Sequence, residues 1–87
     1  MSELSFQIPL REFQGLRLIN LANNHISSLG FLNGCKNVIE VNIAENNIRN
    51  WEEEIFLPKL KILVLDGNPL ESTKGIGQLE NLELLSL

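Results

Sequence analysis

Cysteine is nearly absent from this chain of 87 residues, with Cys35 its one example, so no internal disulfide can form. A reduced thiol is typical of the cytosol and nucleus rather than of secreted domains. No apolar run approaches the length of about 20 residues that a membrane-spanning helix needs. The opening segment, MSELSFQIPLREF, lacks the basic region and apolar stretch of a signal peptide. We therefore expect a cytoplasmic protein, with a cytoskeletal or nuclear location also open, and no membrane contact.

Basic residues are also few, because seven Lys and Arg stand against eleven Asp and Glu, giving a net charge of −4. Nucleic-acid binding needs clustered basic side chains, and here they are scattered. The sequence STKGIGQLE holds a single short glycine turn, too little for a phosphate-binding loop. We expect no nucleic-acid partner and no cofactor.

The combinations of side chains that catalysis needs are missing from the sequence. His25 stands alone after Asn24, and Cys35 has no histidine at a meaningful spacing to activate it. Residues 52–54, three consecutive glutamates, fan around a turn and do not converge on one ion. The sequence therefore predicts no catalytic site, no metal site and no enzyme.

What the chain does contain is a repeat of 22 residues, which aligns Leu16, Val38, Leu60 and Leu82. The aligned segments are LRLINLANNHI, VIEVNIAENNI, LKILVLDGNPL and LELLSL. Each has an aliphatic residue at the start, three on and five on. The first three add an asparagine (Asn24, Asn46 and Asn68) and then another aliphatic residue. A period in this range predicts a solenoid of stacked units.

The first half of each repeat has the alternation of a short strand. It places three pairs of side chains toward the core: Ile19 and Leu21, Val41 and Ile43, and Leu63 and Leu65. Equivalent strands stacked about 4.8 Å apart form a parallel sheet. The asparagine falls where the chain leaves the strand. Its side chain can bond to backbone groups that the turn leaves unpaired, so we expect a ladder of buried asparagines.

The second half of each repeat has apolar residues about three apart, which favours 3₁₀ turns or short helix. These residues are Leu29, Leu32 and Cys35, then Trp51, Ile55 and Leu57, then Ile76 and Leu79. Trp51 followed by residues 52–54 predicts a helical turn with acids near its start. Trp51 itself is either a core residue or an exposed anchor.

The chain reads as one domain, 1–87, with full repeats at 16–37, 38–59 and 60–81. Residues 1–15 match the second half of a repeat and would serve as a cap, and residues 82–87 begin an incomplete one. Solenoid ends need polar caps, yet Leu82, Leu85 and Leu87 make an apolar last rung. We expect that the chain is the N-terminal fragment of a longer protein, or that this rung packs on a second copy as a homodimer. A short array that suffices by itself is the third reading.

The register LxxLxLxxNxI, closing at 22 residues, resembles the leucine-rich repeat family and within it the SDS22-like subfamily. The resemblance implies an α/β repeat solenoid, a right-handed superhelix. Its concave face would be a short parallel β-sheet, and its convex face would carry 3₁₀ or short helical turns. Family members of this kind are mostly intracellular protein-binding modules. Pro69 and Thr73 depart from the pattern, and bacterial internalins, which are secreted or surface proteins, share much of the spacing.

Strand residues that do not enter the core should face the concave side. Stacking would put Leu18, Glu40, Ile62 and Leu84 in one row and Asn20, Asn42, Val64 and Ser86 in the next. An apolar patch rimmed by polar residues indicates a partner site, although strand propensity alone would also account for Ile, Val and Leu. The candidate protein-binding residues are Leu18, Asn20, Glu40, Asn42, Ile62, Val64 and Leu84.

We therefore expect a non-enzymatic protein–protein interaction module, part of a larger intracellular scaffold or regulatory protein. Two alternatives stay open. One is a structural or assembly segment that docks end to end through Leu82, Leu85 and Leu87. The other is an internalin-like bacterial repeat protein.

Overall fold

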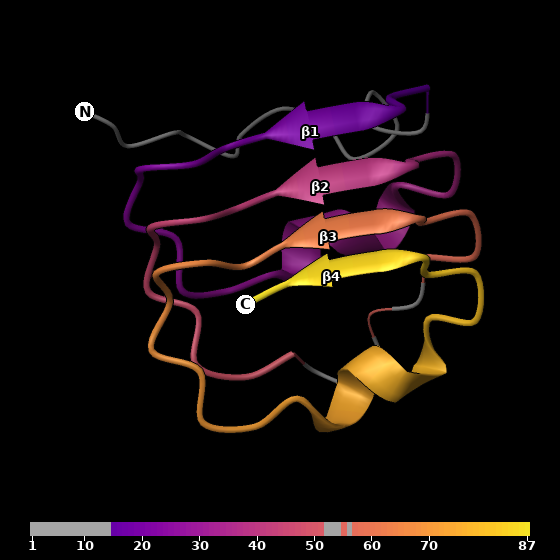
Figure 1. Ribbon diagram of the computed structural model, residues 1–87. Helices are drawn as coiled ribbons and strands as arrows, with labels where there is room; N and C mark the ends of the chain where they lie inside the picture. Colours follow the sequence, from indigo (N-terminus) through magenta and orange to yellow (C-terminus); the bar gives the residue numbers. More distant parts are fainter. Residues whose placement is uncertain (1–14, 52–54, 56) are drawn as a thin grey trace.

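The computed structural model describes residues 15–51, 55 and 57–87. Short strands alternate with turns and two 3₁₀ helices in this part of the chain (Figure 1). In chain order the elements are β1 (Leu18–Asn20), η2 (Gly30–Gly34), β2 (Glu40–Asn42), β3 (Ile62–Val64), η3 (Lys74–Gln78) and β4 (Leu84–Ser86). The 3₁₀ turns predicted for the second half of a repeat are thus confirmed in two places.

The strands form one parallel sheet in the order β1-β2-β3-β4. Leu18 pairs with Glu40, Glu40 with Ile62, and Ile62 with Leu84, so each partner stands one 22-residue repeat further along the chain. The arrows of Figure 1 lie side by side and point the same way. The sheet, its direction and its register agree with the sequence prediction. A further parallel bridge joins Asn50 to Ser72 outside the strands.

The core lies between the sheet and the returning segments. The middle residues of the first three strands, Ile19, Val41 and Leu63, are 7%, 0% and 0% exposed. The residues predicted for the second apolar pattern are buried as well: Leu29, Leu32, Cys35, Trp51, Ile55, Leu57, Ile76 and Leu79. Trp51 is therefore a core residue and not an exposed anchor. Leu21, predicted to point inward, is half-buried against this core.

Asn46 is the buried polar residue of this core, and it joins one repeat to the one before it. Its Oδ1 accepts a hydrogen bond from the Ile26 backbone N–H at 2.9 Å. Its Nδ2 donates to the carbonyl oxygens of Leu21, Ile43 and Ala44 at 3.0, 2.9 and 3.1 Å. One side chain thus satisfies backbone groups of two successive turns, as the sequence predicts.

Asn68 repeats this arrangement one turn later. It accepts from the Ile48 N–H at 2.9 Å and donates to Ile43 O, which lies in the preceding repeat. Asn24, at the first position of the ladder, donates to Leu21 O and Ala22 O in its own turn. Among the described residues, Asn46 and Asn68 therefore link neighbouring turns, whereas the bonds of Asn24 are local.

The last strand presents apolar side chains that the earlier strands bury. Leu85 is 39% exposed and Leu87 is 61% exposed, whereas Leu63, one repeat before Leu85, is fully buried. Leu82 packs half-buried against the core. The predicted apolar last rung is therefore an exposed surface of this chain.

The expected cap at residues 1–15 falls, apart from Gly15, outside the described residues, as does the helical turn expected at residues 52–54. None of the helices in the described part of the chain is long and apolar enough to cross a bilayer.

Candidate functional site

The candidate site is the face of the sheet that points away from the core. Because successive strand residues point to opposite sides, burial of the middle residue of a strand sends its neighbours to this other side. We call this surface the open face. It consists of Leu18, Asn20, Ala22, Glu40, Asn42, Ala44, Ile62, Val64, Asp66, Leu84 and Ser86. In Figure 1, η2 lies behind the sheet.

One row of the open face is mainly apolar. Leu18 is 66% exposed and Leu84 is 52% exposed, and they stand at the two ends of the row. Glu40 and Ile62, between them, are half-buried. The register places these four residues in line across the strands. The structure thus brings together the row that the sequence predicted, with one carboxylate among three aliphatic side chains.

The next row contains two asparagines whose side chains serve the backbone. Asn20 Oδ1 accepts from the Ala22 N–H at 3.2 Å, and Asn42 Oδ1 accepts from the Ala44 N–H at 3.1 Å. Asparagine side chains commonly bond their own backbone two residues on. This local role was not predicted from the sequence, which treated both residues only as partner contacts.

At the strand ends the backbone takes a left-handed conformation at three equivalent positions. The φ angles are 62° at Asn23, 58° at Glu45 and 79° at Gly67. Glycine and asparagine adopt this conformation readily, but other residues pay roughly 1–2 kcal/mol. Glu45 is the residue that departs from this preference. Its carboxylate lies where a Cβ at Gly67 would be, so the missing side chain of Gly67 makes room for it.

This left-handed position was not predicted from the sequence. The available signal was the recurrence of Asn23, Glu45 and Gly67 at one position of the repeat. Two of these three residues are among those that favour a positive φ. The recurrence indicates that the backbone takes the same shape at this position of each repeat, even at Glu45, which does not favour a positive φ.

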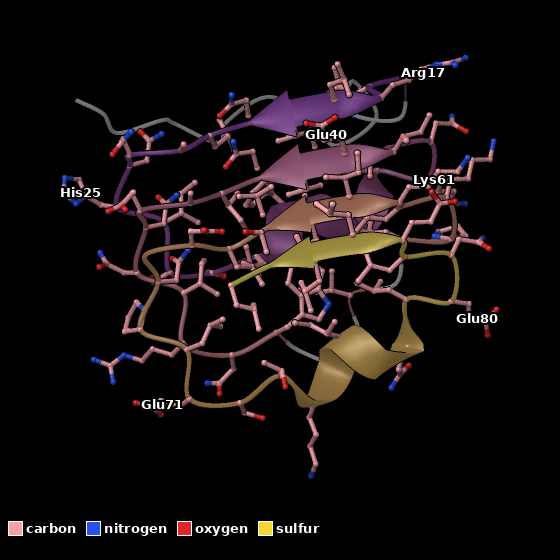
Figure 2. All side chains as sticks on the ribbon, viewed as in Figure 1. Arg17, His25, Glu40, Lys61, Glu71 and Glu80 are labelled. Carbon is pink, nitrogen blue, oxygen red and sulfur yellow. The ribbon has the colours of Figure 1, made fainter. Side chains whose placement is uncertain are left out.

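Charges on and around the sheet are separated. Glu40, Asp66 and Glu45 carry the negative charges of the open face and its strand-end edge. Figure 2 shows Glu40 between β1 and β2, and Arg17 and Lys61 at the edge where the strands begin. Glu83 shares that edge with Arg17 and Lys61, whereas Glu45 and Asp66 lie at the edge where the strands end.

The Asp66 carboxylate is incompletely paired. Its Oδ1 atom is buried and has no hydrogen-bond donor among the described residues, although Asp66 as a whole is half-buried. The Glu45 backbone N–H donates to the Asp66 carbonyl at 2.7 Å, which holds the two residues next to each other. A buried carboxylate oxygen without a donor is costly.

The residues considered for catalysis do not come together. His25 is exposed at the sheet edge opposite Arg17 (Figure 2). Cys35 is buried, and its Sγ donates to the Phe31 carbonyl at 3.7 Å. Burial raises the pKa of the Cys35 thiol above its ordinary value, which disfavours the reactive thiolate. Within the described residues no group of three His, Cys, Asp or Glu side chains could hold a metal ion.

No protein-family model matches this chain, and none of the curated proteins matches it. The physical properties of the open face are therefore what bear on function.

Proposed function

We propose that this chain is a leucine-rich repeat module of the 22-residue type that binds another protein and catalyses no reaction. In this proposal the turns follow a right-handed superhelix, with the open face on its concave side and the 3₁₀ turns on its convex side. The parallel register of one repeat per strand supports it. The asparagine bonds between successive turns support it as well.

The observation that carries the binding function is the exposure of Leu18 and Leu84 on the open face, at 66% and 52%. Strand propensity accounts for Ile62 and Val64, because β-branched residues fit strands wherever they point. It accounts less well for Leu18 and Leu84, because strand preference is strongest for β-branched and aromatic residues. Covering an exposed leucine contributes about 1.5–3 kcal/mol, so a partner over this row gains affinity from both ends of it.

The test begins with a photoreactive residue at position 84, which captures the partner for identification and purification. Binding of that partner is then measured by calorimetry with Leu18→Lys/Ile62→Lys. The control, Ser27→Lys/Gln78→Lys, adds the same charge at exposed positions off the face. We expect the face variant to weaken binding by ~100-fold or more, from two lost apolar contacts, and the control to bind normally. Circular dichroism establishes that both variants fold. Unchanged binding by a folded face variant would exclude the open face.

A second function is favoured by the exposed last rung. Leu85 and Leu87 are exposed where Leu63 is fully buried, and β4 pairs with β3 alone among the described strands. An unpaired apolar edge strand is a template for association. In this alternative, Leu82, Leu85 and Leu87 join the chain end to end with a second copy. Sedimentation equilibrium of the wild type and of Leu85→Lys/Leu87→Lys tests it, and a wild type that stays monomeric at high concentration excludes the dimer.

A further inference from the structure

The open face and its strand-end edge carry charge of one sign. Glu40 lies in the apolar row, Asp66 lies beside Ala44 in the row of the strand ends, and Glu45 follows at the edge. No described residue of these rows is basic. A partner that covers the apolar row must also cover Glu40, because Leu18 and Ile62 flank it in the register.

These carboxylates have no cation of their own within the described part of the chain. The ion pair found there joins Arg49 to Glu71 at 2.9 Å, between two exposed side chains. Desolvating an unpaired carboxylate opposes binding, whereas a cation placed against it favours binding. The chemistry of the face therefore selects a partner that brings positive charge into an apolar contact.

The basic residues near the sheet define where that positive charge should fall. Arg17 and Lys61 lie at the edge where the strands begin (Figure 2), together with Glu83, and all three are exposed. This edge therefore has two basic residues and one acid, and Glu40, the first residue of β2, lies beside it. The opposite edge has only the carboxylates of Glu45 and Asp66 among its described charged residues, so cations of the partner are favoured from Glu40 toward that edge.

The size and hydrogen bonding of the face favour a helix over an extended peptide. Four strands about 4.8 Å apart span about 14 Å, a distance that roughly ten residues of α-helix cover. Residues three or four apart on a helix advance about 4.5–6 Å, close to the strand spacing. The side-chain oxygens of Asn20 and Asn42 already accept backbone hydrogen bonds, so the face offers an extended backbone few acceptors. A helix satisfies its own backbone.

We propose that the occupant of the open face is a basic amphipathic helix of another protein. Its apolar stripe lies across Leu18, Ile62 and Leu84, and its Lys or Arg side chains meet Glu40 and Asp66. This inference rests on the proposed function of the open face, and it adds the chemical class of the partner.

A displayed library of helical peptides, randomised at its exposed positions, serves as the probe. The library is selected against the wild-type chain, and the net charge of the enriched peptides is compared with that of the starting library. An enriched peptide is then measured by fluorescence anisotropy against two variants of equal charge change. The face variant is Glu40→Gln/Asp66→Asn, and the control is Glu71→Gln/Glu80→Gln, whose side chains lie away from Glu40 in Figure 2.

We expect enriched peptides to be cationic with one apolar stripe, and to lose ~10-fold or more in affinity on the face variant. The control should change affinity by less than about twofold, because exposed distant charges are screened. Binding should also weaken as salt is added.

Two results would overturn the inference and differ in what they say of the proposed function. Neutral or acidic peptides that bind the wild type but not Leu18→Lys/Ile62→Lys would leave the face as a binding site and exclude the basic helix. If no peptide is enriched, or if peptides bind Glu40→Gln/Asp66→Asn and Leu18→Lys/Ile62→Lys as tightly as the wild type, both the basic helix and the open face are excluded as the binding mode.

Discussion

Replacing Asn46 with alanine removes the side chain that joins two successive turns, and the structure indicates what each lost bond should cost. In this variant the buried Ile26 N–H loses its hydrogen-bond acceptor, the Oδ1 of Asn46. A buried donor without a partner costs about 1–3 kcal/mol. The three carbonyls that Asn46 served each keep another donor: Leu21 O from Asn24, Ile43 O from Asn68 and Ala44 O from the Asn23 N–H. Each of these lost bonds then costs only about 0.5 kcal/mol. The total is about 2.5–4.5 kcal/mol.

Asn24→Ala is the matched control, because it deletes the same atoms at the equivalent position of the preceding repeat. Asn24 donates to Leu21 O and Ala22 O within its own turn, and no described N–H depends on its oxygen. Leu21 O keeps the bond from Asn46. We expect a loss of about 1 kcal/mol, from two local hydrogen bonds at the low end of their range.

Urea unfolding followed by the fluorescence of buried Trp51 measures both free energies of unfolding. A chain of 87 residues has about 4–13 kcal/mol to lose, so the Asn46 variant should have a much lower midpoint at an unchanged slope. If Asn24→Ala costs as much as Asn46→Ala, the bonds between turns are not the source of the effect, and the reasoning is refuted.

Three other predictions concern the strand-end turn, the last rung and the buried thiol. Glu45→Gly should raise the free energy of unfolding by about 1 kcal/mol, because glycine adopts a positive φ without strain. By contrast, Gly67→Ala should lower it, because its Cβ would meet the Glu45 carboxylate; the same sign for both variants in thermal unfolding would contradict this account. Leu63→Ala should cost about 2–5 kcal/mol, as for a fully buried leucine. Leu85→Ala should cost about 1 kcal/mol or less in dilute solution, because Leu85 is 39% exposed, and an equal loss for the two would show that the last rung is covered. Cys35 should react slowly with a thiol reagent until the chain unfolds. Because burial raises its pKa in the folded state, its contribution to stability is complete below about pH 8.5, the unfolded value, and declines as the pH rises above it. The free energy of unfolding of the wild type should therefore fall relative to that of Cys35→Ala as the pH rises above about 8.5. A constant difference between the two would contradict the raised pKa of Cys35.

The sequence was sufficient for the sheet because the relevant information recurs at one spacing. Leu18, Glu40, Ile62 and Leu84 occupy the same position of the repeat, so any model that stacks the repeats also pairs these residues. Cys35 aligns with Leu57 and Leu79 in the same way and is buried as they are, whereas for Trp51 the alignment left an exposed anchor open and the structure decides for the core.

The features that escaped prediction depend on contacts between particular side chains and not on the repeat. A glutamate gives no sign that it will adopt a positive φ, and Glu45 does so at a position set by its neighbours in the stack. That Asp66 Oδ1 has no donor among the described residues is likewise invisible in a sequence, because the donors near an atom can be counted only in three dimensions. The candidate site could therefore be located from the sequence, but its charge pattern could not.

The constant offset between paired strands also sets how the chain can fold. Contacts between the described elements join only neighbouring strands, so each pairing closes a loop of one repeat. Loop closure costs about (3/2)RT ln n, or roughly 2.7 kcal/mol plus a constant for a loop of this size. This entropy is the same for each pair and does not increase toward the end of the sheet. Loop closure therefore favours no adjacent pair over another, and β2 with β3 is the pair whose central residues, Val41 and Leu63, are both fully buried.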